Sequence, residues 1–394
     1  MKSEWKTIRA ADFMEFNPRM NLKKGTIATK ISMDKLQPYT KKIPETEQAE
    51  FSGGTKFSNS DTIMARITPC LENGKTAFVD CLNKDEVAFG STEFIVLRAK
   101  PGVSDAQFVY YLATSPEFRQ VAIKSMVGSS GRQRVQQPVL ENLELVVPEL
   151  PKQKRIGGFL AAIDDKIALN AKINDNLEQQ AATYFQELFI NNANPVWQIS
   201  TIRDLGTVVG GSTPSKTKPE YYTNNGIAWI TPKDLSINKS KFISHGENDI
   251  TELGLKNSSA TVMPKGTVLF SSRAPIGYIA IASNEVTTNQ GFKSVIPYSE
   301  IGTAFVYFFL KHSLPVIESA ASGSTFKEIS GSAMKNIPAI IPDRNTLDQF
   351  NSFCAPIFAQ QKILEEQNHS LAMLRDSLLP KLMSGAIDIA SIQL

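Results

Sequence analysis

The stretch GGSTPSKTKPEYYTNNGIAWITPKDL, from Gly210 to Leu235, contains residue types that could hold a phosphate group. Its first part differs by one substitution from G-x-x-x-x-G-K-[ST], the pattern whose backbone N–H groups surround nucleotide phosphates. Ser215 replaces the second glycine, however, and Pro214 removes one N–H from the middle of the loop. No hydrophobic strand of the expected kind precedes the stretch, and Pro219 blocks the helix that should follow. We therefore expect no nucleotide-binding loop here.

The same stretch is suited to contact with the backbone of a nucleic acid. Short hydroxyl side chains and glycine amides stand beside lysines and aromatic rings, which are groups that hold phosphate and sugar. Taken alone, a surface loop with solvated lysines is the better interpretation, and only recurrence of the mixture elsewhere favours contact with nucleic acid. The candidate contact residues here are Ser212, Thr213, Lys216, Lys218, Tyr221 and Lys233.

That mixture does recur, in VGSSGRQRVQQ (127–137) and ASGSTFKEIS (321–330). Arginine can contact the edge of guanine through two hydrogen bonds, and glutamine the edge of adenine. Arg66 in MARITP and Arg273 in FSSRAP are expected at comparable places in the two halves of the chain. The other candidate DNA-contact residues are Lys75, Ser129, Ser130, Arg132, Gln133, Arg134, Ser324, Thr325 and Lys327.

These stretches belong to an internal repeat of the chain. Thr7-Ile8-Arg9 recurs as Thr201-Ile202-Arg203, at an offset of 203 − 9 = 194 residues. ENLELVVP, which ends at Pro148, is echoed by KNIPAIIP, which ends at Pro342, and 342 − 148 is again 194. Ordered matches at one offset predict two copies of one unit. The loops differ between the copies more than the strands beside them do, as expected if each copy reads a different sequence.

Each copy divides into two parts of different character. Short alternating runs such as EFIVLRA and GTVLFSS, separated by Gly, Pro and Asn-Gly turns, predict mixed, mostly β domains over 1–149 and 195–343. Helix pairs are expected within them at 106–126 and 303–321. A helical period replaces the turn signals over 150–190 and 344–386, each long enough to reach ~54 Å. The predicted fold class is α+β.

The two long helices carry heptad repeats of apolar residues, which predict an antiparallel coiled coil related by a pseudo-two-fold axis. A core helix of the adjoining domain is the alternative for each. Asn174 and Asn368 stand at equivalent heptad positions, so Asn368 is expected near Asn174 or Asn170. Pro356 should kink the second helix or mark its start. The expected seam residues are Ile163, Ile167, Asn170, Asn174, Leu177, Ile357, Leu364, Asn368 and Leu371.

Composition narrows the possible functions. The 394 residues carry a net charge of +3, which permits nucleic-acid binding without requiring it. No apolar segment has the length of a membrane span or the form of a signal peptide, so a cytoplasmic location is expected. The three histidines and three cysteines form no metal-binding motif, and no N-P-P-[YFW] methyltransferase motif is present. Asp164-Asp165 is expected on a solvated helix face.

The chain resembles the specificity subunits of type I restriction–modification enzymes over nearly its whole length. GSTPSKTKPEYY…GIAWITPKDL looks like the opening of one of their target recognition domains. LPKQKRIGGFLAAIDDKIALNAKINDNLEQQAATYFQELF looks like their central helix, and LRDSLLPKLMSGAI like the end of their C-terminal helix. The first domain departs from the pattern, because it has FNPRMNLKKGTIATKISMDKL and resembles a second subtype.

The resemblance implies a DNA-reading subunit without a catalytic centre. Each recognition domain would read one half of a bipartite double-stranded target, and the helices would set the spacer and dock partners. Those partners would be two methyltransferase subunits that use S-adenosylmethionine and, in a complex that also cleaves DNA, two motor–nuclease subunits that use ATP and Mg²⁺, with no cofactor on this chain. Two alternatives remain open: a coiled-coil scaffold whose β domains bind peptides, and an atypical nucleotide hydrolase built around Gly210 to Thr217.

Overall fold

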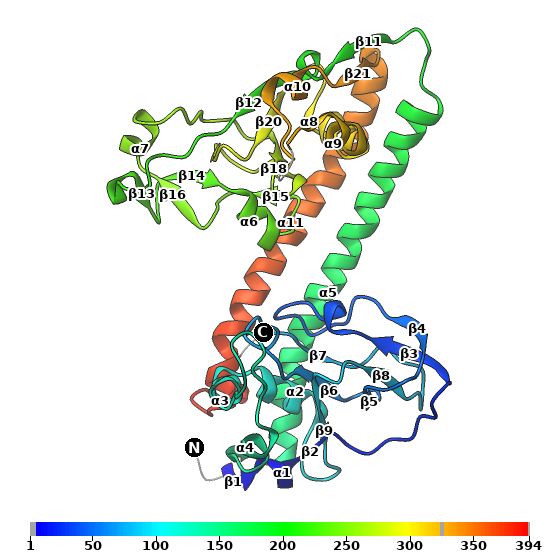
Figure 1. Cartoon of the computed structure of the whole chain (residues 1–394), viewed down its shortest axis with the longest axis vertical. Coiled ribbons are helices and arrows are strands. Elements are labelled where there is room, and N and C mark those ends of the chain that lie inside the picture. The colour runs from blue at the N-terminus through cyan, green and yellow to red at the C-terminus, as the bar shows by residue number, and fades with distance from the viewer. Residues whose placement is uncertain (1–4, 324–326, 393–394) are drawn as a thin grey trace. The chain divides into compact units, whose positions relative to one another are not determined.

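The computed structural model describes residues 5–323 and 327–392, which divide into two compact units (Figure 1). Unit 1 comprises Met1–Leu169 and Asn368–Leu394, and unit 2 comprises Asn170–Gln367. Two long helices, α5 (Leu150–Gln186) and α11 (Arg344–Met383), each contribute residues to both units. A π-helical turn, Glu187–Asn191, follows α5, and a 3-10 turn, Ile389–Ser391, follows α11.

Unit 1 contains two four-stranded sheets and a strand pair. The sheet orders are β2-β9-β6-β7 and β4-β3-β8-β5, and β1 pairs with β10. Helices α2 and α3 bury Phe108, Tyr111 and Phe118 in the core beneath the first sheet. The elements are β1 (Trp5–Arg9), α1 (Ala10–Phe13), β2 (Met14–Phe16), β3 (Ile27–Ile31), β4 (Glu47–Glu50), β5 (Thr55–Phe57), β6 (Thr62–Ala65), β7 (Thr76–Phe78), β8 (Ala88–Gly90), β9 (Phe94–Ala99), α2 (Ala106–Thr114), α3 (Pro116–Lys124), α4 (Gln137–Glu141) and β10 (Glu144–Pro148).

Unit 2 contains a five-stranded sheet, a four-stranded sheet and a strand pair. The orders are β12-β20-β17-β18-β15 and β13-β16-β14-β19, and β11 pairs with β21. The elements are β11 (Gln198–Thr201), β12 (Gly206–Gly210), β13 (Tyr222–Thr223), β14 (Ile227–Ile230), α6 (Pro232–Ile237), β15 (Phe242–Ile243), β16 (Asn248–Ile250), α7 (Glu252–Lys256), β17 (Val268–Ser272), β18 (Ile276–Ala282), β19 (Thr287–Thr288), β20 (Lys293–Pro297), α8 (Thr303–His312), α9 (Leu314–Ala320), α10 (Gly331–Lys335) and β21 (Pro338–Ile341).

The two units share a core topology, which confirms the internal repeat, although β5, β13 and β15 have no counterpart strand in the other unit. The order β2-β9-β6-β7 in unit 1 corresponds to β12-β20-β17-β18 in unit 2. In the second sheet, β3 and β14 each pair antiparallel with one neighbour (β4, β16) and parallel with the other (β8, β19). The helix pairs α2–α3 and α8–α9 fall where the sequence predicts them. The first copy therefore has the same fold as the second although its opening sequence differs.

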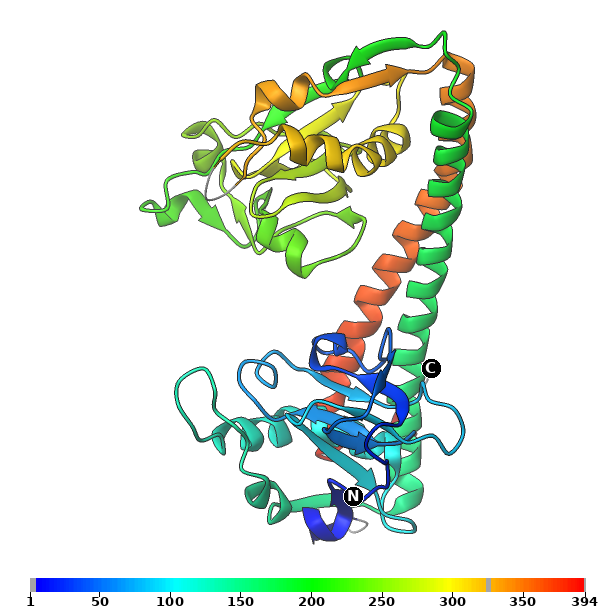
Figure 2. The same ribbon diagram turned by 45° about the vertical axis from the view of Figure 1, so that its right-hand side comes forward.

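Within each unit the segments of α5 and α11 run side by side and antiparallel (Figures 1 and 2). In unit 1, Asn368 Nδ2 donates to the Ile167 carbonyl oxygen at 3.1 Å. In unit 2, Asn174 Nδ2 donates to the Gln361 carbonyl oxygen at 3.4 Å. Asn174 and Asn368 thus each bond the backbone of the opposite helix, a contact that favours one register.

The remaining seam positions are enclosed to different degrees. The side chains of four are buried: Ile163, Asn170, Ile357 and Leu364. Four others are half-buried: Ile167, Leu177, Asn368 and Leu371. α11 begins at Arg344 and continues through Pro356, so the expectation that Pro356 could mark the start of the helix is wrong. Packing of the flanking turns outweighs the one intrahelical hydrogen bond that proline removes.

The expectation of a solvated face at Asp164 is also wrong. Asp164 is 5% exposed. Its carboxylate accepts hydrogen bonds from the Tyr111 hydroxyl at 2.5 Å and from Arg375 Nη1 at 2.6 Å. Asp165, its neighbour, is exposed and forms an ion pair with Lys42 at 3.0 Å. The helix therefore uses one of the two carboxylates inside the seam and the other at its surface.

Candidate functional site

In unit 2, four loop segments meet at one end of the five-stranded sheet. The loop that follows β12 starts beside β20, because Gly210 pairs with Lys293. The segment that follows β17 forms a bridge between Arg273 and Glu328, and Glu328 also bridges Ser322 at the base of a hairpin. Thr213 donates from its hydroxyl to Gln290, in the turn before β20. Candidate residues that are far apart in the sequence thus lie in one place.

The loop from Gly210 to Tyr221 is fixed by its backbone. Ser212 N donates to Thr288 O at 2.8 Å, and Trp229 Nε1 donates to Ser212 O at 3.0 Å. A Cβ on Gly211 would lie 2.0 Å from Asn289 O, so only glycine fits that position. Trp229 is 6% exposed, and its ring is therefore not available as a stacking surface.

This geometry corrects one expectation about the loop. A strand, β12, does lead into it, contrary to the prediction from sequence, because small residues and two valines suffice for a short edge strand. The element that follows the loop is a 3-10 turn, Pro219–Tyr221, and an α-helix does not begin there. A nucleotide loop aims helix N-terminal amides at its phosphates, and this chain lacks that helix at this point.

The loop presents cations at its surface. Lys216 and Lys218 are exposed, and Lys218 Nζ lies 3.7 Å from Glu220. Lys233, in α6, is exposed and donates to Glu247 at 2.6 Å, a hydrogen bond that raises the pKa of Lys233. Tyr221 is half-buried, and its carbonyl oxygen accepts from Thr251 N at 3.0 Å.

A charged cluster occupies the centre of the convergence. Arg273 Nη1 lies 3.3 Å from Glu328, and Lys293 Nζ lies 3.6 Å from the same carboxylate. Sequence reasoning missed Glu328, Lys293 and Gln290, because only strand pairing brings them beside Arg273 and Thr213. Lys327 is exposed, whereas Ser324 and Thr325 lie outside the described residues.

Unit 1 has the same arrangement at the corresponding end of its sheet. The hairpin that carries Ser129, Ser130 and Arg132, all exposed, closes at a bridge between Val127 and Arg134. Arg134 is exposed and contacts Glu93 through Nε at 3.0 Å and Nη2 at 2.7 Å. Gln133 is half-buried, and its backbone N–H donates to Thr68 Oγ1 at 3.0 Å.

Two unit 1 candidates have their cationic groups occupied by the protein backbone. Arg66 Nη2 donates to the Val135 carbonyl oxygen at 3.3 Å. Lys75 Nζ donates to the Met33 carbonyl oxygen at 2.9 Å. Both side chains are half-buried. These two hydrogen bonds link loop segments within unit 1.

The expected equivalence of Arg66 and Arg273 is wrong by one residue. Ile67 forms the bridge to Arg134 as Arg273 forms the bridge to Glu328. Val135 N bonds Arg66 O in the way that Ile329 N bonds Ser272 O. Neighbouring residues of an extended segment point to opposite faces, so the two arginines differ in direction. The corresponding pair at the hairpin base is instead Arg134 and Glu328.

The loop between β2 and β3 contains further cations that the sequence reasoning did not select. Arg19, Lys23 and Lys24 are exposed there, and the equivalent loop in unit 2 carries Lys216 and Lys218. The repeat itself was the signal that could have identified them. The described residues, 5–323 and 327–392, contain no cluster of three or more His, Cys, Asp or Glu side chains that could hold a metal ion. In the same part of the chain, no helix is long and apolar enough to cross a membrane.

Comparison with known proteins gives consistent matches. A family model described as type I restriction modification DNA specificity domain matches residues 2–179 and 195–368. The MjaIX specificity subunit of Methanocaldococcus jannaschii is 43% identical over 162 residues, which are 41% of this chain and 37% of that protein. The HindI specificity subunit of Haemophilus influenzae is 23% identical over 84% of this chain and 87% of its own length.

A solved structure shares the fold. The S subunit of the type I restriction-modification system from M. genitalium superposes with a TM-score of 0.57 at 17% identity, and the alignment covers 96% of each chain.

Proposed function

Because the chain belongs to the family of type I restriction modification DNA specificity domains, we propose that it is the DNA-recognition subunit of such an enzyme. Each unit reads one half of a bipartite double-stranded target through its loop convergence. The observation that carries this proposal is that the same end of the sheet gathers exposed cations and hydroxyls in both units, with opposite charges at the equivalent positions Arg134 and Glu328. Different chemistry on equivalent scaffolds suits two different half-sites.

The complex would act in the cytoplasm, with the chemistry on its partners. Two methyltransferase subunits would dock on the helices and supply S-adenosylmethionine, and motor–nuclease subunits would supply ATP and Mg²⁺. This chain would contribute recognition and spacing without a catalytic group. The exposed lysines would contact DNA phosphates. The charged residues where the hairpins close, Arg134 and Glu328, would contact nucleotide bases.

Methylation mapping tests the proposal directly. Genomic DNA from cells with and without this chain is compared for modified bases. The expected result is that one split motif, with adenines methylated in both halves, is lost when the chain is removed. An unchanged methylation pattern would contradict the proposal.

The two alternatives have their own measurements. Purified chain is assayed for ATP turnover, for DNA binding and for peptide capture. Turnover that disappears on substitution of Lys216 would support the hydrolase, and peptide capture without DNA binding would support the scaffold. The hydrolase has little structural support, because the segment after Thr217 forms a 3-10 turn, Pro219–Tyr221, and not the α-helix that a nucleotide loop requires.

A further inference from the structure

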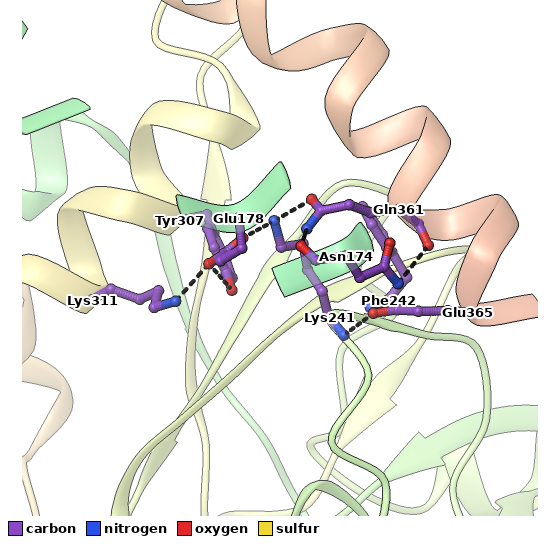
Figure 3. A network of polar contacts seen from close by, with 8 residues as sticks. All are labelled: Asn174, Glu178, Lys241, Phe242, Tyr307, Lys311, Gln361 and Glu365. Atoms are coloured by element: carbon purple, nitrogen blue, oxygen red, sulfur yellow. Dashed lines mark hydrogen bonds and ion pairs between the residues drawn. The ribbon is translucent and has the colours of Figure 1, made fainter. Parts of the chain in front are cut away.

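A lysine of the recognition domain in unit 2 is buried against both long helices (Figure 3). Lys241, just before β15, is 7% exposed. Its ammonium group forms an ion pair with Glu178 of α5 and donates to Gln361 Oε1 of α11 at 2.6 Å. It also lies 4.0 Å from the centroid of the Phe358 ring, on α11. One side chain of the β domain therefore contacts two helices at once.

The backbone around Lys241 is also held, by α11 alone of the two helices. Glu365 of α11 accepts hydrogen bonds from Lys241 N at 2.7 Å and from Phe242 N at 3.1 Å. Gln361 Nε2 in turn donates to Asn174 O of α5 at 3.1 Å. The network consequently joins the domain to the helix seam and also joins the two helices to each other.

A third element completes the charge balance. Glu178 Oε1 accepts from Lys311 Nζ at 2.6 Å and from the Tyr307 hydroxyl at 3.2 Å, both on α8. Burial opposes ionisation of Glu178, but Lys241 and Lys311 outweigh that effect and lower the pKa of the carboxyl. Burial lowers the pKa of Lys241, and its ion pair with Glu178 acts in the opposite direction.

Burying such a network is costly, and it is seldom the best way to gain stability. Apolar side chains of similar volume often serve stability equally well or better. What charged, hydrogen-bonded groups add is direction, because each bond is satisfied in one arrangement only. The network is thus suited to fixing how the domain of unit 2 is turned on its helices.

The repeat supplies an independent observation. Lys41 occupies the equivalent position in unit 1, since its carbonyl oxygen accepts from Phe78 N as that of Lys241 accepts from Ile281 N. Lys41 is 2% exposed and lies over the rings of Phe78 and Tyr111. The carboxylates of α5 whose charges act on Lys41 are Asp165 and Asp164, whereas Lys241 pairs with Glu178. A buried lysine is kept at this junction in both copies although its surroundings have changed.

We propose that Lys241 is a positioning residue, which together with Glu178, Gln361 and Glu365 sets the orientation of the second recognition domain on the helices and thereby the spacer that the complex accepts. This inference rests on the proposed function. The network touches none of the loop residues assigned to DNA contact, so it should act on spacing and leave half-site preference unchanged.

The test uses the full chain assembled with its methyltransferase partners. Binding is measured on duplexes with both cognate half-sites and with spacers of the cognate length n, n − 1 and n + 1. Wild type should prefer n, and Lys241→Met should reduce the ratio of binding at n to binding at n ± 1 by about tenfold. Lys239→Met is the matched control, because Lys239 is exposed, lies over the Tyr278 ring and carries the same charge.

Glu365→Gln provides a second variant, which keeps an oxygen acceptor but removes the charge. It should lower the same ratio, and the control should not. Equal weakening at every spacer, with the ratio intact in both variants, would overturn the inference and leave a purely structural role. Failure of the proposed function would look different, because wild type itself would then show no preference for duplexes with both half-sites.

Discussion

Arg134 and Glu328 take the same position at the base of the hairpin in their units, yet they carry opposite charges. Arg134 pairs with Glu93, whereas Glu328 pairs with Arg273 and Lys293. Arginine donates to guanine, and a carboxylate accepts from the amino group of cytosine. These residues are the strongest candidates for base contacts that differ between the half-sites.

Glu328→Gln should alter recognition of the second half-site alone. Loss of the carboxylate frees Arg273 and Lys293, and discrimination at one base pair should change by ~1–3 kcal/mol. The measurement is binding to duplexes with single base-pair changes in each half-site. Arg134→Gln is the counterpart, with its effect in the first half-site. An effect spread over both half-sites would contradict the assignment.

Lys216→Ala should weaken binding evenly across DNA sequences. Lys216 is exposed on a loop fixed by its backbone, which suits a phosphate contact. Loss of one such contact should reduce the slope of log affinity against log salt by about 1. Lys265→Ala serves as the control, because Lys265 is exposed at the opposite end of β17 from Arg273. A sequence-dependent loss for Lys216→Ala would argue for a base contact.

Arg375→Met should destabilise unit 1 strongly. It leaves Asp164, 5% exposed, without its cationic partner, and removing one member of a buried ion pair costs about 3–5 kcal/mol. Adding Asp164→Asn should recover part of that loss. Urea unfolding of the two variants gives the comparison. A single variant as stable as wild type would show that the pair contributes nothing.

Among the elements, the helices were the most predictable from sequence. Their heptads are local patterns, and the chain fixes α5 and α11 within a few residues of the predicted ranges 150–190 and 344–386. The loop convergence was not predictable in the same way. Lys293 lies beside Gly210 only because β20 pairs with β12. The ion pair between Arg375 and Asp164 in the helix seam was not predictable either, because its members are 211 residues apart. No periodicity reports contacts at such separations.

Cys354 gives a chemical test of the helix packing in unit 2. It lies on α11, it is buried, and burial raises the pKa of its thiol to about 12. Burial also raises the pKa of Cys81, but its side chain is exposed, so alkylation of the native chain near neutral pH should modify Cys81 and spare the buried Cys354. Mass spectrometry of the peptides reports both sites. Denaturant should expose Cys354, and equal native rates would contradict the packing.

For the molecule as a whole, the repeat predicts a division of labour. The two units share a core topology and equivalent loop clusters, and each buries one lysine of its β domain, Lys41 or Lys241. Two recognition sites that contact the same face of a DNA duplex need centres about one helical turn, ~34 Å, apart. A helix of 37 residues is long enough to supply that distance at ~1.5 Å per residue.

Domain exchange followed by methylation mapping tests this account most directly. Residues 1–148 are replaced by the corresponding domain of another family member, the complex is expressed in cells, and the methylated motif is read from the genome. The account predicts that one half of the motif changes while the other half and the spacer stay as they were. A motif in which both halves change together would contradict it, and the repeat would then be a structural duplication without separate recognition.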